Sequence, residues 1–202
     1  GDHSFSALAG FVASRYVGES ANSSIRGFSD NKIHSMNAGT VLNKPSEDYG
    51  ASTNASVLGR VTYDYQNKYL ATVNFRADGS SKFGVNNRWG YFPSFSLGWR
   101  LTGEEFMKPL DWLSDLKLRV GWGQVGNDQV GYYSSYGIYG IGANYNMDGI
   151  ILPGYYQSQI GNDKLRWERT TQTNVGLDFS FLNGRMTLTA DAYYKNCLLY
   201  TS

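Results

Sequence analysis

Residues 56–76, SVLGRVTYDYQNKYLATVNFR, hold two runs of alternating side chains joined by the short polar turn 66–68. One face of the resulting hairpin is mainly apolar and carries Val57, Val61, Tyr63, Tyr65, Tyr69, Ala71, Val73 and Phe75. The other face is polar and carries Arg60, Thr62, Asp64, Thr72, Asn74 and Arg76. Alternation with a period of two is typical of β-strands with one apolar and one polar face. This segment therefore predicts an antiparallel β-hairpin.

The same period of two recurs along the rest of the chain. It predicts further strands at about 4–15, 94–101, 116–122, 173–181 and 186–194, which with the hairpin make seven and give an all-β protein. The last two strands are joined through Asn183-Gly184, a strong signal for a tight hairpin turn. The connection 102–114 resembles one helical turn, with Thr102 as the predicted N-cap and Glu105 completing a capping box.

The connections between strands fall into two length classes. Those at 66–68 and 182–184 are short, whereas those at about 16–55, 77–92 and 125–170 are long and rich in Gly, Asn, Ser and Tyr. Outer-membrane β-barrels have short periplasmic turns and long extracellular loops in this alternating order. The pattern favours an antiparallel up-and-down transmembrane β-barrel, and a soluble β-sandwich is the alternative.

The composition of the 202 residues fits both architectures. Aromatic residues are frequent, with 16 Tyr, 10 Phe and 5 Trp, and the mean hydropathy is −0.41. A membrane barrel alternates lipid-facing and lumen-facing side chains, so its mean hydropathy stays near that of a soluble protein. The net charge of +1 is spread along the chain and gives no basic face for a nucleic acid. No run approaches the roughly 18 apolar residues of a transmembrane helix.

Charges and aromatic rings bear on the choice between sandwich and barrel. Charged residues on the polar faces would be solvated in a sandwich, but in a barrel they would line a polar lumen and pair across strands. They are Arg60, Asp64, Arg76, Arg100, Lys117, Arg119, Asp178, Arg185 and Asp191. Aromatic residues on the apolar face gather near the short turns, as in the girdles that lie at the lipid headgroup level. They are Tyr63, Tyr65, Tyr69, Phe179 and Phe181.

Two long stretches carry motifs specific enough to suggest a family. Residues 56–127 include YDYQNKYL, RADGSSKFGVNNRWGYFPSFSLGWR and LKLRVGWGQVGN. Residues 162–179 are NDKLRWERTTQTNVGLDF. Together these stretches closely resemble the SusC/RagA family of TonB-linked outer-membrane proteins, whereas residues 1–55 resemble it only loosely.

The resemblance implies a 22-stranded barrel with an N-terminal plug domain. The seven predicted strands would form part of the wall of that barrel. It assigns residues 1–196 to a partial TonB-dependent receptor β-barrel domain in the outer membrane of a Gram-negative bacterium of the Bacteroidota type. The implied partners are a SusD-type surface lipoprotein, outer-membrane lipid and the TonB complex. TonB would act through a plug and a TonB box that are not in this sequence. The implied cargo is an oligosaccharide or a peptide.

The last six residues, 197–202, are CLLYTS and include the single cysteine, Cys197, which excludes an internal disulfide. One possible coding sequence for them resembles a transposon-end adapter used in sequencing libraries. We therefore expect 197–202 to be a translated adapter that follows Asn196, and a true strand end is the alternative. Because the chain opens at Gly1 without a signal sequence, we expect an internal fragment.

Few residues predict catalysis, a metal or a cofactor. The span 121–126 matches G-x-G-x-x-G, but these glycines run from a strand into a loop, whereas a nucleotide site needs a following helix. We expect them to relieve crowding in the barrel wall. His3 and His34 are isolated, and Glu104-Glu105 is interpreted as favourable charge at a helix start. We therefore expect no metal, no cofactor and no enzymatic activity.

The long loops hold the candidate binding residues. Asp78, Arg88 and Trp89 combine hydrogen-bonding groups with an aromatic ring, which suits a glycan. The alternative is that Arg88 and Trp89 hold their loop against the barrel mouth. The loop 132–160 is the stronger candidate for specificity, because Tyr gives a large amphipathic contact at low entropic cost. Its candidate residues, which could equally face the lipoprotein, are Tyr132, Tyr133, Tyr136, Tyr139 and Tyr145.

The sequence thus predicts an outer-membrane transporter component for TonB-dependent uptake of a bulky nutrient, with a SusD-type lipoprotein. The alternative is a soluble β-sandwich module that binds glycans on tyrosine-rich loops. Partitioning separates the two, because a soluble module stays in the aqueous phase without detergent. We do not expect the chain to fold alone, since both terminal strands of a partial barrel would be open edges in lipid.

Overall fold

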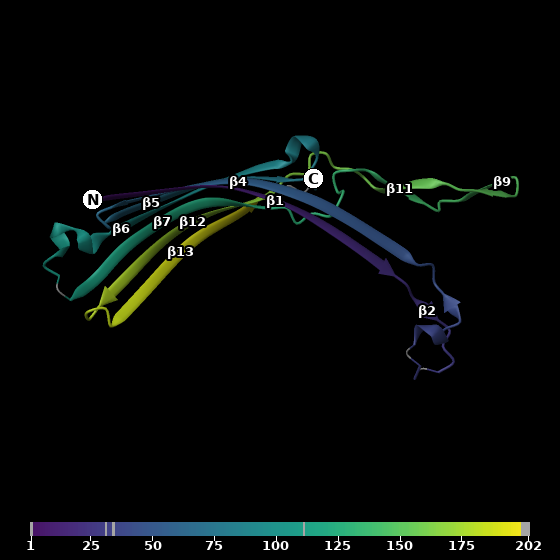
Figure 1. Ribbon diagram of the computed structural model, residues 1–202, viewed down its shortest axis with the longest axis horizontal. Coiled ribbons are helices and arrows are strands. Elements are labelled where there is room, and N and C mark those ends of the chain that lie inside the picture. The colour runs from purple at the N-terminus through teal and green to yellow at the C-terminus, as the bar shows by residue number, and fades with distance from the viewer. Residues whose placement is uncertain (1, 31, 34, 111, 199–202) are drawn as a thin grey trace.

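The computed structural model describes residues 2–30, 32–33, 35–110 and 112–198 (Figure 1). Seven long strands form one antiparallel sheet in the order β1-β4-β5-β6-β7-β12-β13. Each of these strands therefore pairs with the next long strand along the chain, as in an up-and-down barrel wall. Their bounds are His3–Asn22 (β1), Ser46–Tyr65 (β4), Tyr69–Ser80 (β5), Trp89–Arg100 (β6), Leu113–Asn127 (β7), Glu168–Phe181 (β12) and Met186–Leu198 (β13).

The remaining elements are short and belong to the connections. Three small ribbons pair β2 (Ile25–Arg26) with β3 (Val41–Leu42), β8 (Ile138–Ile141) with β11 (Tyr155–Gln159), and β9 (Tyr145–Met147) with β10 (Ile150–Leu152). The 3₁₀ helices are η1 (Met36–Ala38), η2 (Val85–Asn87), η3 (Leu101–Gly103) and η4 (Glu105–Met107). In the described part of the chain, no helix is long and apolar enough to cross a membrane.

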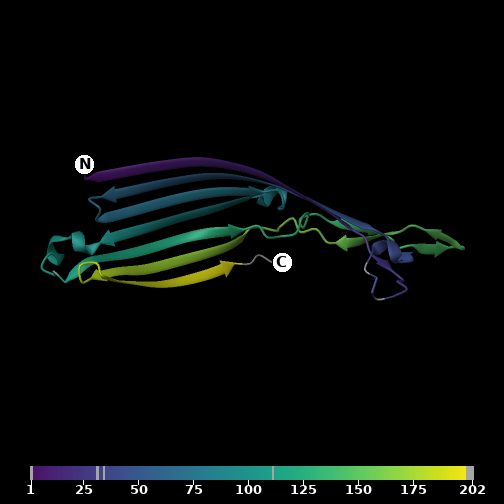
Figure 2. The same cartoon turned by 60° about the horizontal axis from the view of Figure 1, so that its bottom comes forward.

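The long strands lie side by side in a single curved layer (Figures 1 and 2). Among the described residues, the buried hydrophobic side chains are only Phe83, Phe92 and Leu113. A sandwich would instead bury the facing sides of two sheets. The alternative of a β-sandwich is therefore wrong, and the predicted partial barrel wall is confirmed, although seven strands leave the barrel open.

Residues directly opposite each other in an antiparallel pair point to the same face of the sheet. Paired residues therefore form rows across the strands, and successive rows point alternately to the outer and the inner face. One outer row consists of Phe5, Tyr63, Ala71, Leu97, Val120, Val175 and Ala192. The next row lies on the inner face and consists of Ser6, Thr62, Thr72, Ser96, Gly121, Asn174 and Tyr193. The alternation seen in the hairpin 56–76 thus continues across all seven strands.

The apolar outer face is uncovered: the exposed fractions are 68% for Phe5, 56% for Val73 and 53% for Leu97. The strand segment from Tyr69 to Ala77 is roughly 27 Å long at about 3.4 Å per residue. This length is comparable to the apolar band, about 25 Å tall, of an outer-membrane barrel. The outer face therefore matches a lipid-facing surface.

Aromatic rings border this apolar band at both ends. At the short-turn end, Tyr65, Tyr69 and Trp99 stack in series, with ring centroids 6.2 and 6.4 Å apart. Near the long-loop end, Phe75 stacks on Tyr91 with centroids 6.2 Å apart. Ring contacts also join Trp112 to Phe179 and Phe179 to Phe181. These rings lie where aromatic girdles meet the lipid headgroups.

On the inner face, a charge cluster joins three adjacent strands. The Arg119 guanidinium on β7 donates to both Asp178 oxygens on β12, at 2.8 and 2.9 Å, and to Asp191 Oδ1 on β13 at 3.0 Å. Gly176 lies directly opposite Arg119, and a Cβ there would lie 2.8 Å from the Arg119 Cζ atom. Glycine thus leaves room for the guanidinium. The cross-strand pairing of inner-face charges is confirmed for this cluster.

All seven long strands are longer than the sequence predicts, and in β1 and β4 the additional residues pair with each other. β1 and β4 pair along their entire lengths, from His3 opposite Tyr65 to Asn22 opposite Ser46. The predicted strand at 4–15 and the predicted loop at 16–55 are therefore wrong beyond Arg15. The reason is that polar residues occupy both faces of this upper part, so no alternation marks it. Figure 2 shows β1 and β4 continuing past the other strands as a two-stranded ribbon.

The connection between β6 and β7 contains two 3₁₀ helices, neither with a side-chain cap. The Thr102 hydroxyl donates to Asp115 Oδ1 at 2.9 Å and accepts the Leu116 N–H at 3.4 Å. Glu105 instead contacts the Lys108 ammonium at 2.6 Å. The predicted capping box is therefore wrong, because β7 takes the Thr102 hydroxyl.

Strand β13 ends at Leu198 and thus includes the first two residues of 197–202, the segment that we expect to be a translated adapter. In β13, Cys197 lies opposite Thr170 of β12. The Cys197 thiol donates to Glu168 Oε1 at 2.9 Å. Residues 199–202 lie outside the described residues. The assignment of 197–202 to an adapter stays a prediction.

Glu104 ties the β6–β7 connection to the aromatic girdle. Its Oε1 atom accepts hydrogen bonds from the Tyr69 hydroxyl at 2.6 Å and the Trp99 indole N–H at 3.2 Å. Lys68 Nζ lies 3.9 Å from Glu104 Oε2. These hydrogen bonds, the one from Tyr69 first, hold the pKa of the Glu104 carboxyl below its usual value.

We predict that Glu104→Gln lowers the unfolding midpoint of a complete barrel containing these strands at neutral pH. Because the pKa is lower in the folded state, ionised Glu104 stabilises that state above the unfolded pKa, about 4.3. This contribution disappears as the pH falls through the lowered folded pKa. Thermal unfolding of wild type and variant from about pH 7 to about pH 3 measures the difference. If the unfolding midpoints of wild type and variant differed by the same amount in acid as at neutral pH, the stabilising role of the carboxylate would be contradicted.

Candidate functional site

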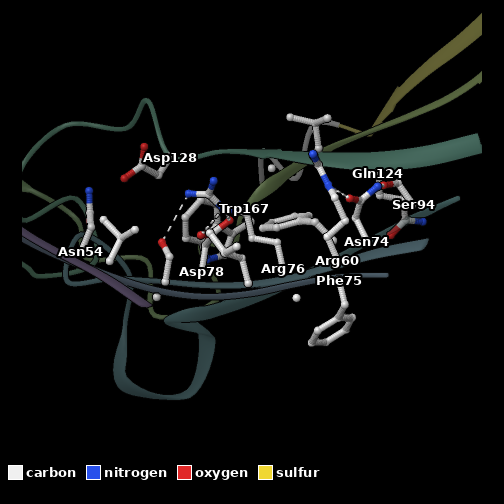
Figure 3. Close-up of a pocket in the computed structure, with 18 of the residues that line it drawn as sticks. Asn54, Arg60, Asn74, Phe75, Arg76, Asp78, Ser94, Gln124, Asp128 and Trp167 are labelled. Carbon is white, nitrogen blue, oxygen red and sulfur yellow. Dashed lines mark hydrogen bonds and ion pairs between the residues drawn. The ribbon is translucent and has the colours of Figure 1, made fainter. Parts of the chain in front are cut away.

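A hollow of about 780 Å³ lies on the inner face at the long-loop end of the sheet (Figure 3). We call it the inner hollow. Its polar lining consists of Ser14, Asn54, Ser56, Arg60, Asn74, Arg76, Asp78, Ser94, Gln124 and Asp128. Its apolar lining includes Leu8, Val12, Leu58, Phe92 and Trp167. The hollow thus combines many hydrogen-bonding groups with two aromatic rings.

Strand alternation aims these polar side chains inward. Ser56 lies directly opposite Asp78, and Arg60 lies directly opposite Asn74, so both pairs share the inner face. Phe75, between Asn74 and Arg76, points to the other side of the sheet (Figure 3). The lining is therefore set by the same register that makes the outer face apolar.

Hydrogen bonds hold several lining groups in place. Arg76 Nε donates to both Asp78 carboxylate oxygens, at 2.6 and 2.8 Å, and Arg76 Nη2 donates to Ser56 Oγ at 3.4 Å. Arg60 Nε donates to Asn74 Oδ1 at 2.6 Å. The Arg76 side chain remains 53% exposed, so the pair adds little to stability. Its fixed charges and donors are instead open to a ligand.

The Asn54 side chain is one lining group without an internal partner. Its Oδ1 atom is buried and accepts no hydrogen bond among the described residues. A buried acceptor without a partner is costly and leaves a place for a donor from outside. The inner hollow can therefore make additional hydrogen bonds without losing its own.

An aromatic cluster closes the long-loop end of the inner hollow. The Trp167 ring lies 5.2 Å from the Phe83 ring and 5.5 Å, edge to face, from the Phe92 ring. Phe83 is completely buried. A Cβ at Gly126 would lie 2.5 Å from Phe92 Cε1, so glycine is required beside this ring. The expectation that a glycine of 121–126 relieves crowding is thus met at this position.

Two hydrogen bonds fasten the long β7–β12 connection to the β5–β6 loop. The Trp167 indole N–H donates to the Arg88 carbonyl at 2.9 Å. The Asn87 side-chain amide donates to the Asp163 carbonyl at 2.8 Å. These contacts place Trp167 at the inner hollow, although it is the last residue of a connection of forty residues, 128–167.

The three candidates of the β5–β6 region do not converge. Asp78 lines the inner hollow. Trp89 lies directly opposite Gly79, in a row on the outer face. Trp89 and Arg88 line a second hollow. The structure therefore places Asp78 on one face of the sheet and Trp89 on the other.

Tyr132 is packed against the extended ribbon of β1 and β4. Its ring is parallel to that of Tyr16, with centroids 6.3 Å apart, and Lys82 Nζ lies 5.6 Å from its centroid. A Cβ at Gly50 would lie 2.6 Å from the Tyr132 ring. Desolvation, and then the nearby Tyr16, raises the pKa of the Tyr132 phenol. Tyr132 thus fixes the start of its loop.

The other candidate tyrosines are spread along the loop. Tyr133 and Tyr136 share a turn, in which their carbonyls both accept hydrogen bonds from the Gln159 side chain at 3.1 Å. Tyr139 on β8 and Tyr145 on β9 are 69% and 54% exposed. Figure 2 shows β8–β11 extending away from the main sheet. The candidates therefore form a base and an exposed arm rather than one pocket.

His3 Nδ1 lies 2.8 Å from the Tyr63 hydroxyl oxygen in the short-turn girdle, and His34 lies outside the described residues. Within the described ranges, no cluster of three His, Cys, Asp or Glu side chains could hold a metal. The arrangement provides noncovalent recognition through hydrogen bonds and aromatic contacts.

Comparison with known proteins identifies the family of this wall. The family model described as TonB dependent receptor-like, beta-barrel, matches residues 2–196. The chain belongs to the TonB-dependent receptor β-barrel family. The sheet is accordingly part of the wall of an outer-membrane TonB-dependent receptor barrel, and the resemblance drawn from 56–127 and 162–179 is confirmed.

Relatives of this TonB-dependent receptor barrel cover nearly the whole chain. TonB-dependent receptor P39 of Formosa agariphila is 37% identical over 98% of the chain and 19% of its own length. TonB-dependent receptor SusC of Bacteroides thetaiotaomicron is 43% identical over 71% of the chain and 15% of its own length. The RagAB peptide transporter structure has a TM-score of 0.83 at 29% identity, over 97% of this chain and 22% of that chain. The chain thus spans about a fifth or less of its curated relatives.

Sequence reasoning missed most of the inner hollow. Arg60 and Arg76 were expected to line the lumen, but Asn54, Gln124 and Trp167 were not singled out. Strand register would have marked Asn54, because it lies two residues before Ser56 on the polar face. Nothing in local periodicity marks Trp167, since it reaches the hollow through the fold of a long connection.

We predict that Gly126→Ala destabilises a complete barrel containing these strands by about 1–3 kcal/mol, because the methyl group collides with Phe92 and forces it to move. Gly121→Ala is the matched control on the same strand. The nearest atom to a Cβ at Gly121 lies 3.8 Å away, so a methyl group fits there. Denaturant unfolding of both variants measures the effect. Equal stability of the two variants would refute the requirement for glycine beside Phe92.

Proposed function

We propose that this chain is part of a transporter that imports a bulky nutrient across the outer membrane with energy from the TonB complex. The observation that carries the proposal is the inner hollow, a polar recognition surface on the lumen side of a lipid-facing wall. The similarity to the RagAB peptide transporter and to SusC supports it. TonB would act on a plug domain of the complete protein.

The chemistry of the inner hollow suits a cargo rich in hydroxyl or amide groups, either an oligosaccharide or a peptide. Two arginines and two carboxylates nearly balance in charge, and the other polar lining groups are neutral hydroxyls and amides. Sugar hydroxyls and peptide groups both need such mixed donors and acceptors, and both pack on aromatic rings such as that of Trp167. Asp78 is the candidate residue that lies in this hollow. No bond is made or broken in this function, so we propose no enzymatic step.

We also propose that the arm around β8–β11 contacts a SusD-type surface lipoprotein. Between Gln129 and Gly161 the only charged residue is Asp148, whereas tyrosines and isoleucines are frequent. Exposed apolar side chains of this arm include Tyr139, Ile141, Met147, Ile150, Ile151 and Tyr155. An uncharged surface rich in Tyr is suited to protein contact, since interfaces favour aromatic residues and exclude charges from their cores. Tyr132, Tyr133 and Tyr136 would hold the base of the arm.

Transport is tested with the full-length receptor that contains this chain. We predict that the double change Arg76→Gln, Asp78→Asn lowers uptake of labelled cargo about tenfold, since it removes charge-assisted hydrogen bonds to the ligand. Glu47→Gln is the control, because Glu47 lies at the exposed start of β4 outside the inner hollow. Wild-type uptake should also stop when TonB is removed. Uptake that persists without TonB would overturn the proposed transport.

The lipoprotein contact has a separate test. Gly142 N–H donates to the Gly154 carbonyl at 3.2 Å, so these residues can be joined after residues 143–153 are deleted. We expect the shortened receptor to lose copurification of the lipoprotein while the barrel stays folded. The control replaces Asp148 by Asn and keeps the arm at full length. Undiminished copurification of the lipoprotein after the deletion would show that the arm is not its binding site.

A further inference from the structure

A second hollow, of about 570 Å³, lies at the long-loop end of the sheet. Most of its strand residues belong to outer rows (Ala13, Arg15, Thr53, Ala55, Gly79 and Trp89), whereas Ser14, Asn54 and Ser80 belong to an inner row. We call it the outer hollow. Its floor consists of Ala13, Ala55 and Gly79, which lie directly opposite one another on β1, β4 and β5. Trp89 on β6 lies opposite Gly79, and a Cβ at Gly79 would lie 3.1 Å from the Trp89 ring. The indole therefore lies against the glycine and forms a wall beside a floor of small residues.

Two guanidinium groups line the outer hollow, those of Arg15 and Arg88. Neither forms an ion pair with a carboxylate in the described part of the chain. Arg88 Nε is buried and has no hydrogen-bond partner among the described residues. A buried guanidinium donor without an acceptor is costly, so this position is suited to an anion from outside. The outer hollow thus has the charge of an anion site.

Hydroxyl groups complete the polar lining. Thr53 lies directly opposite Arg15, and Ser81 lines the same hollow. The Thr53 N–H donates to Ser81 Oγ at 2.8 Å, and the Ser81 N–H donates to the Thr53 carbonyl at 2.9 Å. These bonds fix the Ser81 hydroxyl against the Thr53 backbone. Arginine forks and hydroxyls are the groups that bind phosphate oxygens most effectively.

The position of the outer hollow relative to the membrane indicates the source of the anion. Its floor residue Gly79 lies two residues, about 7 Å, beyond Ala77, which is opposite Tyr91 of the long-loop girdle. Aromatic girdles lie at the level of the lipid headgroups. The outer hollow is therefore continuous with the lipid-facing surface and lies where the phosphates of the outer leaflet are found.

We propose that the outer hollow binds the anionic phosphate group of an outer-leaflet lipid. Arg15 and Arg88 would donate to the phosphate oxygens, and the Trp89 indole would pack beside the apolar part of the same lipid. The two hollows share Ser14, Asn54 and Gly79, but Arg15, Arg88 and Trp89 do not line the inner hollow, so this role is independent of cargo import. It gives the motif around Trp89 a contact on the lipid side.

The test counts bound lipid on the purified full-length receptor by native mass spectrometry after incubation with monophosphoryl lipid A or with phosphatidylcholine. We expect monophosphoryl lipid A to be retained and phosphatidylcholine, which has no net charge, to be lost. The double change Arg15→Gln, Arg88→Gln should lower lipid affinity at least about tenfold, since it removes charge-assisted hydrogen bonds. The double change Arg15→Lys, Arg88→Lys should restore part of the binding.

Controls separate this site from general attraction to a charged surface. The double change Arg26→Gln, Lys44→Gln removes an equal charge from residues that do not line the outer hollow and should leave lipid retention unchanged. Heat-modifiable gel mobility, which reports a folded barrel, should be the same for all variants. Retention of monophosphoryl lipid A by the Gln variants at the wild-type level would overturn the proposal. Displacement of the lipid by inorganic phosphate at equal concentration would also overturn it, because the site would then bind the free anion.

Discussion

Backbone hydrogen bonds between neighbouring strands set the register, and the rest of the structure depends on that register. In lipid, an unpaired N–H or carbonyl costs several kcal/mol, so strands that cross a membrane must pair along their length. With side chains at a period of two, a shift by one residue would exchange the two faces. Rows such as Phe5 to Ala192 outside and Ser6 to Tyr193 inside follow from this pairing. Both hollows are lined by residues that the same rows select.

The sequence predicted the parts of this wall that lie in the apolar band, because there the alternation has a clear contrast. The strands at 116–122 and 173–181 are such cases, and their charges Arg119 and Asp178 pair as a lumen wall should. The upper parts of β1 and β4 were missed, because polar residues occupy both faces there, as Glu19 and Ser20, which point to opposite faces, show. Family motifs, rather than periodicity, marked the segment that contains Trp167.

The candidate site was less predictable than the fold. Asp78 was singled out and lies in the inner hollow, but its neighbours in sequence, Arg88 and Trp89, lie at the outer hollow. Asp78 and Trp89 lie on paired strands, and Trp89 is opposite Gly79 rather than Asp78, so the register sends them to different faces. Composition alone does not give that register. The tyrosines were grouped by sequence as one surface, whereas the structure divides them between a packed base at Tyr132 and an exposed arm at Tyr145.

The division of the β7–β12 connection into a packed base and an exposed arm allows the arm to change independently of the barrel during evolution. The base of the β7–β12 connection is fixed by Trp167 and Tyr132, which pack on residues from other connections and strands. The tip closes on itself through the hydrogen bond between Gly142 and Gly154. Insertions, deletions or exchanges within the tip therefore leave the membrane-spanning wall intact. A lineage can therefore change the length and sequence of this arm without having to evolve a new barrel.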